Sequence, residues 1–142
     1  MYYFAYGSNL CKRQMKERCP KSIYLMRATL PGFRFVYDGN SDKRKGAVGN
    51  ILPSVGESVK GVIYEIDETE KVVLDKCEGV PSSYQSRIIE VLGQNGEKYH
   101  CLVYSRSGRV EGKPSEEYKN IVLEGALESG LDMDYVVRYL KK

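Results

Sequence analysis

The chain opens with the stretch Tyr2-Tyr3-Phe4-Ala5-Tyr6-Gly7-Ser8-Asn9-Leu10. Its aromatic first half predicts a β-strand, and Gly7 followed by the capping residues Ser8 and Asn9 predicts a turn into a helix that extends to about Arg18. A strand that turns into a capped helix leaves backbone N–H groups that the helix itself cannot satisfy. The positive end of the helix dipole lies behind these groups, so they favour an anion. The same pattern also fits an ordinary strand–turn–helix junction, so its meaning depends on the rest of the chain.

The composition is that of an ordinary globular protein. The chain has 142 residues, 42% of them hydrophobic and 29% charged, which predicts a single domain over residues 1–142. The net charge is only +3, and the basic residues occur in separate short runs, which disfavours nucleic-acid binding. No segment approaches the ~18 apolar residues of a membrane span, and the N-terminus lacks the pattern of a signal peptide. We therefore expect a cytoplasmic protein that binds neither membranes nor nucleic acid.

The cysteines and the single histidine point to no metal or redox site. The four cysteines stand at positions 11, 19, 77 and 101, and their spacing fits neither zinc nor thiol–disulfide motifs. Reduced thiols are expected in a cytosolic protein. A triad of the Ser-His-Asp or Cys-His type would have to use His100, which lies in a strand-like run and is expected to be structural or exposed. We expect no metal and no cofactor.

Hydrophobic alternation and turn residues predict about seven short strands and about four helices. The strands are expected at residues 2–6, 23–30, 33–37, 48–52, 59–66, 84–92 and 98–105. The helices are expected at about 8–18, 67–77, 114–130 and 132–140. The strands follow one another too closely for βαβ crossovers, so the sheet should be mostly antiparallel. We expect an α+β fold, a small, mostly antiparallel β-barrel with helices packed around it.

Local signals place the breaks between these elements. Pro31 and Gly32 predict a turn between two strands, and the polar run at residues 38–46 predicts an exposed loop. Asp67 followed by Glu70 predicts a capping box. Asn95-Gly96 predicts a hairpin turn between the last two strands.

Glu78 is the main candidate for acid–base chemistry. It stands at the end of a predicted helix, just before Gly79 and Pro81. A carboxylate at that end opposes the helix dipole, and burial would add to the cost of its charge. Both effects raise a carboxyl pKa toward the range that a proton shuttle needs near neutral pH. The alternative is an exposed loop acid.

Tyr118 is the second candidate. It lies in the first turn of the helix that Pro114 and Ser115 introduce, from where its hydroxyl could reach a pocket. The alternative is a half-buried core aromatic, and with 12 tyrosines in the chain one tyrosine alone is weak evidence.

Taken together, four segments resemble the γ-glutamylcyclotransferase family. They are Tyr-Phe-Ala-Tyr-Gly-Ser-Asn-Leu at 3–10, Gly-Val-Ile-Tyr at 61–64, Leu-Asp-Lys-Cys-Glu-Gly-Val-Pro-Ser-Ser-Tyr at 74–84 and Lys-Pro-Ser-Glu-Glu-Tyr at 113–118. The tail from Gly125 through Tyr135 is similar as well. The resemblance runs from Tyr2 to about Leu140 and implies a small β-barrel with an AIG2-like fold. It also implies an enzyme in which the α-amine of a γ-glutamyl substrate attacks its own γ-carbonyl, releasing 5-oxoproline and an amine or amino acid.

The resemblance assigns roles to particular residues. Glu78 matches the catalytic acid/base, and Tyr118 and Tyr84 match pocket tyrosines. Asn9 matches the motif with a main role in holding the loop. The rest of the γ-glutamyl cradle is the run Tyr3, Phe4, Ala5, Tyr6, Gly7 and Ser8. A homodimer is also compatible with the family.

The chemistry suits these residue types. The substrate amine is mostly protonated at neutral pH and must lose a proton before it attacks. Glu78 could take that proton and give one to the leaving nitrogen, and the protein's main task is to hold a folded near-attack conformer. We expect the N–H groups of Gly7, Ser8 and Asn9 to bind the substrate carboxylate or to stabilise the developing oxyanion.

The polar segment at 38–49 departs from the segments that resemble the family, since it carries three consecutive basic residues at 43–45. Such a loop should line the mouth of the pocket and contact the leaving part of the substrate, which could be an amino acid, an amine or a pathway intermediate.

Two other functions remain open at this point. One is a non-catalytic ligand-binding or interaction protein on the same barrel, and the other is a small nucleic-acid-binding barrel, which the dispersed charge disfavours.

Overall fold

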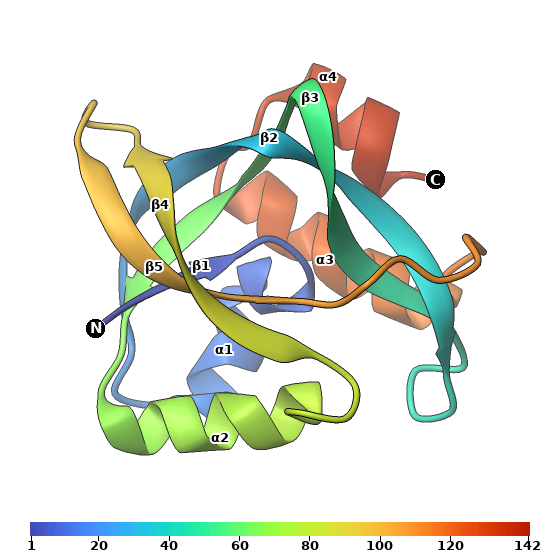
Figure 1. Cartoon of the computed structure of the whole chain (residues 1–142), viewed down its shortest axis with the longest axis horizontal. Coiled ribbons are helices and arrows are strands. Elements are labelled where there is room, and N and C mark those ends of the chain that lie inside the picture. Colours follow the sequence, from blue (N-terminus) through green and yellow to red (C-terminus); the bar gives the residue numbers. More distant parts are fainter.

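A computed structural model describes residues 1–142 and shows a closed barrel of five strands. The strands are β1 (Tyr2–Ala5), β2 (Ile23–Ser41), β3 (Gly46–Glu65), β4 (Gln85–Gly93) and β5 (Lys98–Ser105). Around the barrel they follow the order β1-β3-β2-β4-β5 (Figure 1). Four of the pairings are antiparallel, and only β1 and β5 run parallel, with Tyr3 opposite Leu102. The predicted, mostly antiparallel barrel is confirmed.

Five strands replace the seven short strands that we predicted, because two pairs of predicted strands join into the long strands β2 and β3. The predicted turn at Pro31-Gly32 is wrong, because β2 continues through it and keeps pairing with β3, from Pro31 opposite Ser58 to Phe33 opposite Pro53. A register shift accommodates the interruption: Gly32 adopts a left-handed φ of 84°, so the strand is irregular without reversing direction. Residues 48–52 and 59–66 likewise join into β3.

The exposed loop that we predicted at 38–46 is present only as a turn at residues 42–45, and the start of the segment is part of a strand. Strand β2 extends to Ser41, and Asp38 is fully buried at 0% exposure. A buried carboxylate requires partners. Asp38 accepts hydrogen bonds from Arg106 Nη2 at 2.6 Å and from Asn50 Nδ2 at 3.1 Å. These partners come from later parts of the chain, so the local run of polar residues gave no sign that Asp38 is buried.

The helices agree better with the prediction. They are α1 (Lys12–Arg18), α2 (Glu68–Glu78), α3 (Glu116–Glu128) and α4 (Met133–Tyr135), with a 3₁₀ turn η1 (Ser8–Leu10) and a π-helical segment η2 (Val136–Leu140). The capping box at Asp67 and Glu70 is present, and Ser115 caps α3. The helix predicted from Ser8 is split into η1 and α1, because Cys11 between them is extended.

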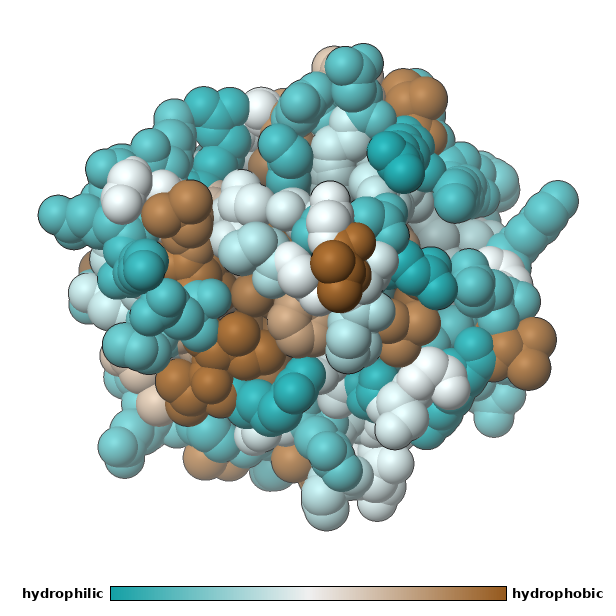
Figure 2. All heavy atoms as spheres, turned by 45° about the horizontal axis from the view of Figure 1, so that its top comes forward, coloured by the Kyte–Doolittle hydropathy of each residue, from teal (hydrophilic) through white to brown (hydrophobic).

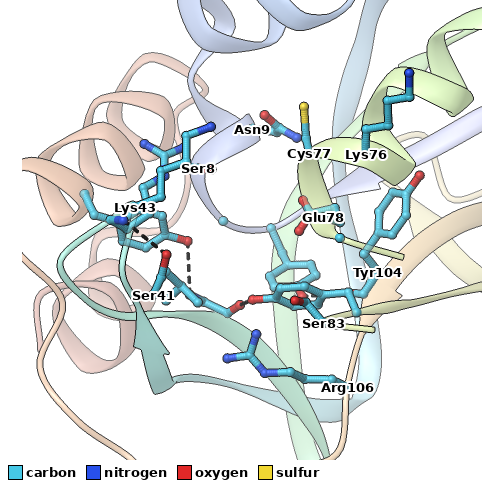
Figure 3. A pocket seen from close by; sticks show the side chains of 18 of the residues that line it. Ser8, Asn9, Ser41, Lys43, Lys76, Cys77, Glu78, Ser83, Tyr104 and Arg106 are labelled. Carbon is cyan, nitrogen blue, oxygen red and sulfur yellow. Dashed lines mark hydrogen bonds between the residues drawn. The ribbon is translucent and has the colours of Figure 1, made fainter. Parts of the chain in front are cut away.

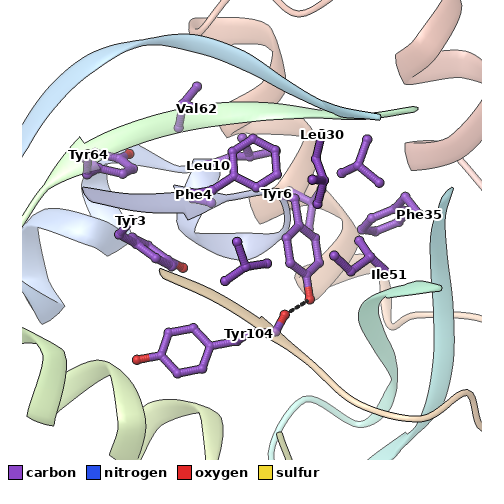
Figure 4. Packing of buried hydrophobic residues seen from close by; sticks show 14 of the residues in the cluster. Tyr3, Phe4, Tyr6, Leu10, Leu30, Phe35, Ile51, Val62, Tyr64 and Tyr104 are labelled. Carbon is purple, nitrogen blue, oxygen red and sulfur yellow. Dashed lines mark hydrogen bonds between the residues drawn. The ribbon is translucent and has the colours of Figure 1, made fainter. Parts of the chain in front are cut away.

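The helices and the barrel share one core. Helix α2 lies along one end of the barrel, whereas α3 and α4 pack on its far side (Figure 1). Phe4, Leu10 and Ile51 are among the side chains buried completely or almost completely (Figure 4). Strand β1 approaches β3 so closely that a Cβ at Gly61 would lie 2.2 Å from the Ala5 carbonyl oxygen. Strand β1 is therefore held on both sides, and the loop that follows it starts from a rigid base.

Hydrophilic side chains dominate the face shown in Figure 2, where hydrophobic residues gather in a few small patches. Single exposed apolar side chains such as Val55 and Val110 are ordinary on a protein surface. None of the helices has the length and the apolar character needed to cross a membrane.

Candidate active site

A pocket of about 390 Å³ opens at one end of the barrel. Many segments contribute to its wall, among them the loop after β1, the tip of the β2–β3 hairpin, the C-terminal end of α2, the segment before β4, the segment after β5 and the first turn of α3 (Figure 3). These segments are far apart in sequence, and the closed barrel brings them together. The site is therefore a product of the fold rather than of any one motif.

Glu78 is the last residue of α2, and its side chain lines the pocket. Gly79 follows in a left-handed conformation with φ 66°, which ends the helix at this point. The Glu78 carboxylate takes part in none of the protein's hydrogen bonds or ion pairs, in contrast to Asp38. Burial raises the pKa of Glu78 above its ordinary value, although the positive charges of Arg18, Arg44 and Arg106 partly oppose the shift. A carboxyl group without a partner and with a raised pKa suits proton transfer.

Gly49 on β3 fixes two pocket tyrosines. Its N–H donates to the hydroxyl oxygen of Tyr118 at 3.0 Å, and its carbonyl accepts from the hydroxyl of Tyr84 at 2.6 Å. In the contact with Gly49 the Tyr118 oxygen is the acceptor, so this contact does not use the hydroxyl proton. Burial raises the pKa of both tyrosines, so both hydroxyls keep their protons at neutral pH. The structure thus places Tyr118 and Tyr84 together and orients both through the backbone of one residue, Gly49.

The turn at Gly7, Ser8 and Asn9 also faces the pocket. Its first backbone hydrogen bonds run from Leu10 N–H to Gly7 and from Cys11 N–H to Ser8, so the three preceding N–H groups have no acceptor within the helical turn. No side chain caps this turn. These N–H groups are the donors for which the sequence predicts anion binding.

Asn9 connects the turn to its surroundings. Its amide nitrogen donates to the Tyr3 hydroxyl at 2.9 Å, and its amide oxygen accepts from Gln14 at 2.9 Å and from Arg18 at 3.1 Å. Its backbone carbonyl accepts from Tyr64 at 3.1 Å. With all these groups engaged inside the protein, Asn9 is placed to hold the loop.

The structure brings nearly all predicted site residues into one pocket. Its wall contains Tyr3, Phe4, Tyr6, Gly7, Ser8, Asn9, Glu78, Tyr84 and Tyr118. Ala5 is the exception: it is buried in β1 opposite Val62 and does not line the pocket. Phe4 is fully buried in the core, so it supports the pocket more than it contacts a ligand.

Sequence reasoning missed most of the charged residues of the pocket. Six basic side chains line it beside two carboxylates: Arg18, Lys43, Arg44, Lys76, Arg106 and Arg109, with Asp42 and Glu78. Only the run at 43–45 was flagged. The sequence around Arg106 did not indicate a pocket residue, because the position of its side chain depends on a 2.6 Å ion pair with Asp38, a residue 68 positions earlier. No group of three or more His, Cys, Asp or Glu side chains is placed to hold a metal ion.

Comparisons with known proteins point in one direction. Residues 58–139 match the model of the AIG2-like family. The γ-glutamylcyclotransferase of Bos taurus is 32% identical over 138 residues, which cover 94% of this chain and 73% of that protein. The γ-glutamylaminecyclotransferase of Rattus norvegicus is 41% identical, but over only 61 residues, 38% of this chain and 41% of that protein. A solved γ-glutamyl cyclotransferase structure superposes with a TM-score of 0.92 at 31% identity, covering 99% of this chain and 86% of that one.

Proposed function

The chain belongs to the AIG2-like family of γ-glutamylcyclotransferases, and we propose that Glu78 and the turn at Gly7–Asn9 form its catalytic centre. Its activity is that of the family, the release of 5-oxoproline from a γ-glutamyl compound. The observation that carries the assignment of the centre is the unpartnered carboxylate of Glu78, which lines the same pocket as this turn. Most of the tyrosine and arginine side chains there are engaged in hydrogen bonds within the protein.

In the proposed reaction the substrate's α-amine, once neutral, attacks its own γ-carbonyl carbon. The new C–N bond closes a five-membered ring, and the bond to the leaving nitrogen breaks. From the substrate ammonium to the ring amide the attacking nitrogen loses two protons, and the leaving nitrogen gains two when it departs as an ammonium ion. Glu78 carries protons between the two nitrogens, so the reaction uses neither water nor a covalent enzyme intermediate.

The rest of the pocket holds the substrate in the folded conformation that this attack requires. The free N–H groups of Gly7, Ser8 and Asn9 bind either the substrate α-carboxylate or the oxyanion that develops on the γ-carbonyl. Tyr118 donates its hydroxyl proton to the bound γ-glutamyl group, since Gly49 already occupies a lone pair of its oxygen.

The proposal extends to the cellular location and the oligomeric state of the protein. All four cysteines are free thiols, which supports a cytoplasmic location, where thiols stay reduced. A homodimer is compatible with the family, and light scattering on the purified protein would measure the mass in solution.

Replacement of Glu78 by Gln tests the proposal, because it keeps the shape of the side chain and removes its capacity to carry protons. We expect the rate of 5-oxoproline release to fall by about 10²- to 10⁴-fold. The assay uses a panel of γ-glutamyl dipeptides and γ-glutamylamines. Glu68→Gln is the matched control, since Glu68 is the exposed first residue of the same helix and the charge change is identical. Full activity of Glu78→Gln would rule out the proposed role.

A further inference from the structure

The pocket has a strongly basic side that the cyclisation itself does not need. Lys43 and Arg44 lie at the tip of the β2–β3 hairpin, and Arg106 and Arg109 lie on the segment after β5. Figure 3 shows Lys43 and Arg106 on sides of the pocket away from α2. The γ-glutamyl part of a substrate brings one carboxylate, which the turn at Gly7–Asn9 or Arg18 can bind.

The segment after β5 is tied firmly to the hairpin. Asp38 on β2 accepts from Arg106 Nη2 at 2.6 Å and from the backbone N–H of Arg109 at 3.1 Å. Gly39 N–H donates to Val110 at 2.9 Å. A Cβ at Gly39 would lie 2.9 Å from Arg106 Nη2 and 3.3 Å from Arg109 Cδ, so both arginine side chains cross the strand at this glycine. The two basic segments therefore lie side by side and form one rim of the pocket.

The charges of this rim are only partly balanced inside the protein. Arg106 pairs with the buried Asp38, but its own Nε–H is buried and has no acceptor. Arg44 donates to the amide oxygen of Gln14 at 2.8 Å, and its Cζ lies over the Tyr118 ring, 5.2 Å from the ring centroid. It has no carboxylate partner. Lys43 and Arg109 form no ion pair, and the one unpaired carboxylate at the rim is Asp42. After Asp42 is counted, the rim keeps two uncompensated positive charges.

We propose that this rim selects γ-glutamyl substrates whose leaving group carries two anionic groups, that is, γ-glutamyl derivatives of acidic amino acids. The proposal rests on the cyclotransferase function above. Such a leaving group brings an α-carboxylate and a side-chain carboxylate, which match the two uncompensated charges of the rim. An amine leaving group brings no negative charge and leaves the rim unmatched. The pocket discriminates by charge complementarity, which sets partner choice more than raw affinity.

The test compares γ-glutamyl-glutamate with γ-glutamyl-glutamine, which have nearly the same size and differ by one charge. We expect kcat/KM to be about tenfold higher for γ-glutamyl-glutamate at low ionic strength, as a small number of partly exposed ion pairs can supply. The ratio should shrink toward one at about 0.5 M salt, where exposed charges are screened. It should also shrink in the double variant Lys43→Gln/Arg109→Gln.

Lys45→Gln is the matched control, because Lys45 belongs to the same turn and does not line the pocket. It should keep the wild-type ratio. Equal kcat/KM values for the two wild-type reactions, or a ratio that the double variant leaves unchanged, would overturn the inference. In either of these cases 5-oxoproline is still released, so the proposed function stands. If neither dipeptide nor γ-glutamyl-alanine released 5-oxoproline, the proposed function itself would fall, and this inference with it.

Discussion

At the residue scale, the site depends on Glu78, whose carboxylate lines the pocket without a hydrogen-bond or ion-pair partner in the protein. Asp38 is fully buried, and its carboxylate accepts hydrogen bonds from Arg106, Asn50 and the Arg109 backbone. Glu78 has no such donor, and burial dominates the opposing effect of nearby arginines on its pKa. Two carboxylates of one pocket region are thus given different roles by their surroundings.

This difference predicts an effect of Glu78 on stability. Because its pKa is raised in the folded protein, the folded state binds the proton more tightly than the unfolded chain does. The free energy of unfolding therefore falls as pH rises from the unfolded pKa, about 4.3, through the raised folded pKa. Above that window the ionised Glu78 destabilises the fold, so Glu78→Gln should have a higher Tm than the wild type at pH 8.

Thermal unfolding of both proteins between pH 4 and pH 8 measures the effect. We expect the two Tm curves to approach each other toward pH 4 and to separate above it, with the inactive variant the more stable. A Glu78→Gln variant that is less stable than the wild type at pH 8 would show that the carboxylate has a stabilising partner.

At the element scale, the pocket depends on how closely α3 packs on the turn η1. A Cβ at Gly125 of α3 would lie 2.2 Å from the carbonyl carbon of Leu10 and 2.3 Å from the nitrogen of Cys11. Both are backbone atoms, so neither can move without moving the turn that carries Gly7 and Ser8. Gly125 therefore sets the position of the anion-binding turn from outside the pocket.

Gly125→Ala should accordingly lower both stability and activity. Alanine favours a helix over glycine by about 0.5–1 kcal/mol, so an isolated helix would gain from the change. We expect instead a loss of about 1–3 kcal/mol in urea unfolding, as for other overpacked sites, together with a lower kcat/KM. Gly112→Ala is the control, since a Cβ there would meet only Ala47 Cβ, at 3.6 Å. A Gly125→Ala protein with wild-type stability and activity would refute this packing argument.

At the scale of the whole molecule, the sequence predicts those features that neighbouring residues determine. The barrel class, the Asp67 capping box, the Asn95-Gly96 hairpin and the Glu78 and Tyr118 positions all follow from local patterns or from the family resemblance. The joining of seven predicted strands into five does not, because Pro31 and Gly32 have the composition of a turn. Only the pairing of β2 with β3 on both sides of them shows that the strand continues.

The basic rim shows the same limit at the site. Lys43 and Arg44 stand in a visible run, but Arg106 and Arg109 reach the pocket only because Asp38 holds their segment beside β2. Asp38 itself was predicted to be exposed. Long-range pairs of this kind are set by the closed barrel, so single-sequence patterns carry no signal for them.

The most direct test of the cyclisation mechanism is whether oxygen from water enters the products. Wild-type protein and Glu78→Gln are incubated with γ-glutamyl-glutamate in H₂¹⁸O, and the masses and amounts of the products are measured by mass spectrometry. Intramolecular attack by the amine predicts 5-oxoproline without ¹⁸O above background, one free amino acid for each 5-oxoproline, and strongly reduced release by the variant. Glutamate labelled with ¹⁸O in its γ-carboxyl group would instead show hydrolysis by water, and would contradict the cyclisation mechanism that this pocket is proposed to perform.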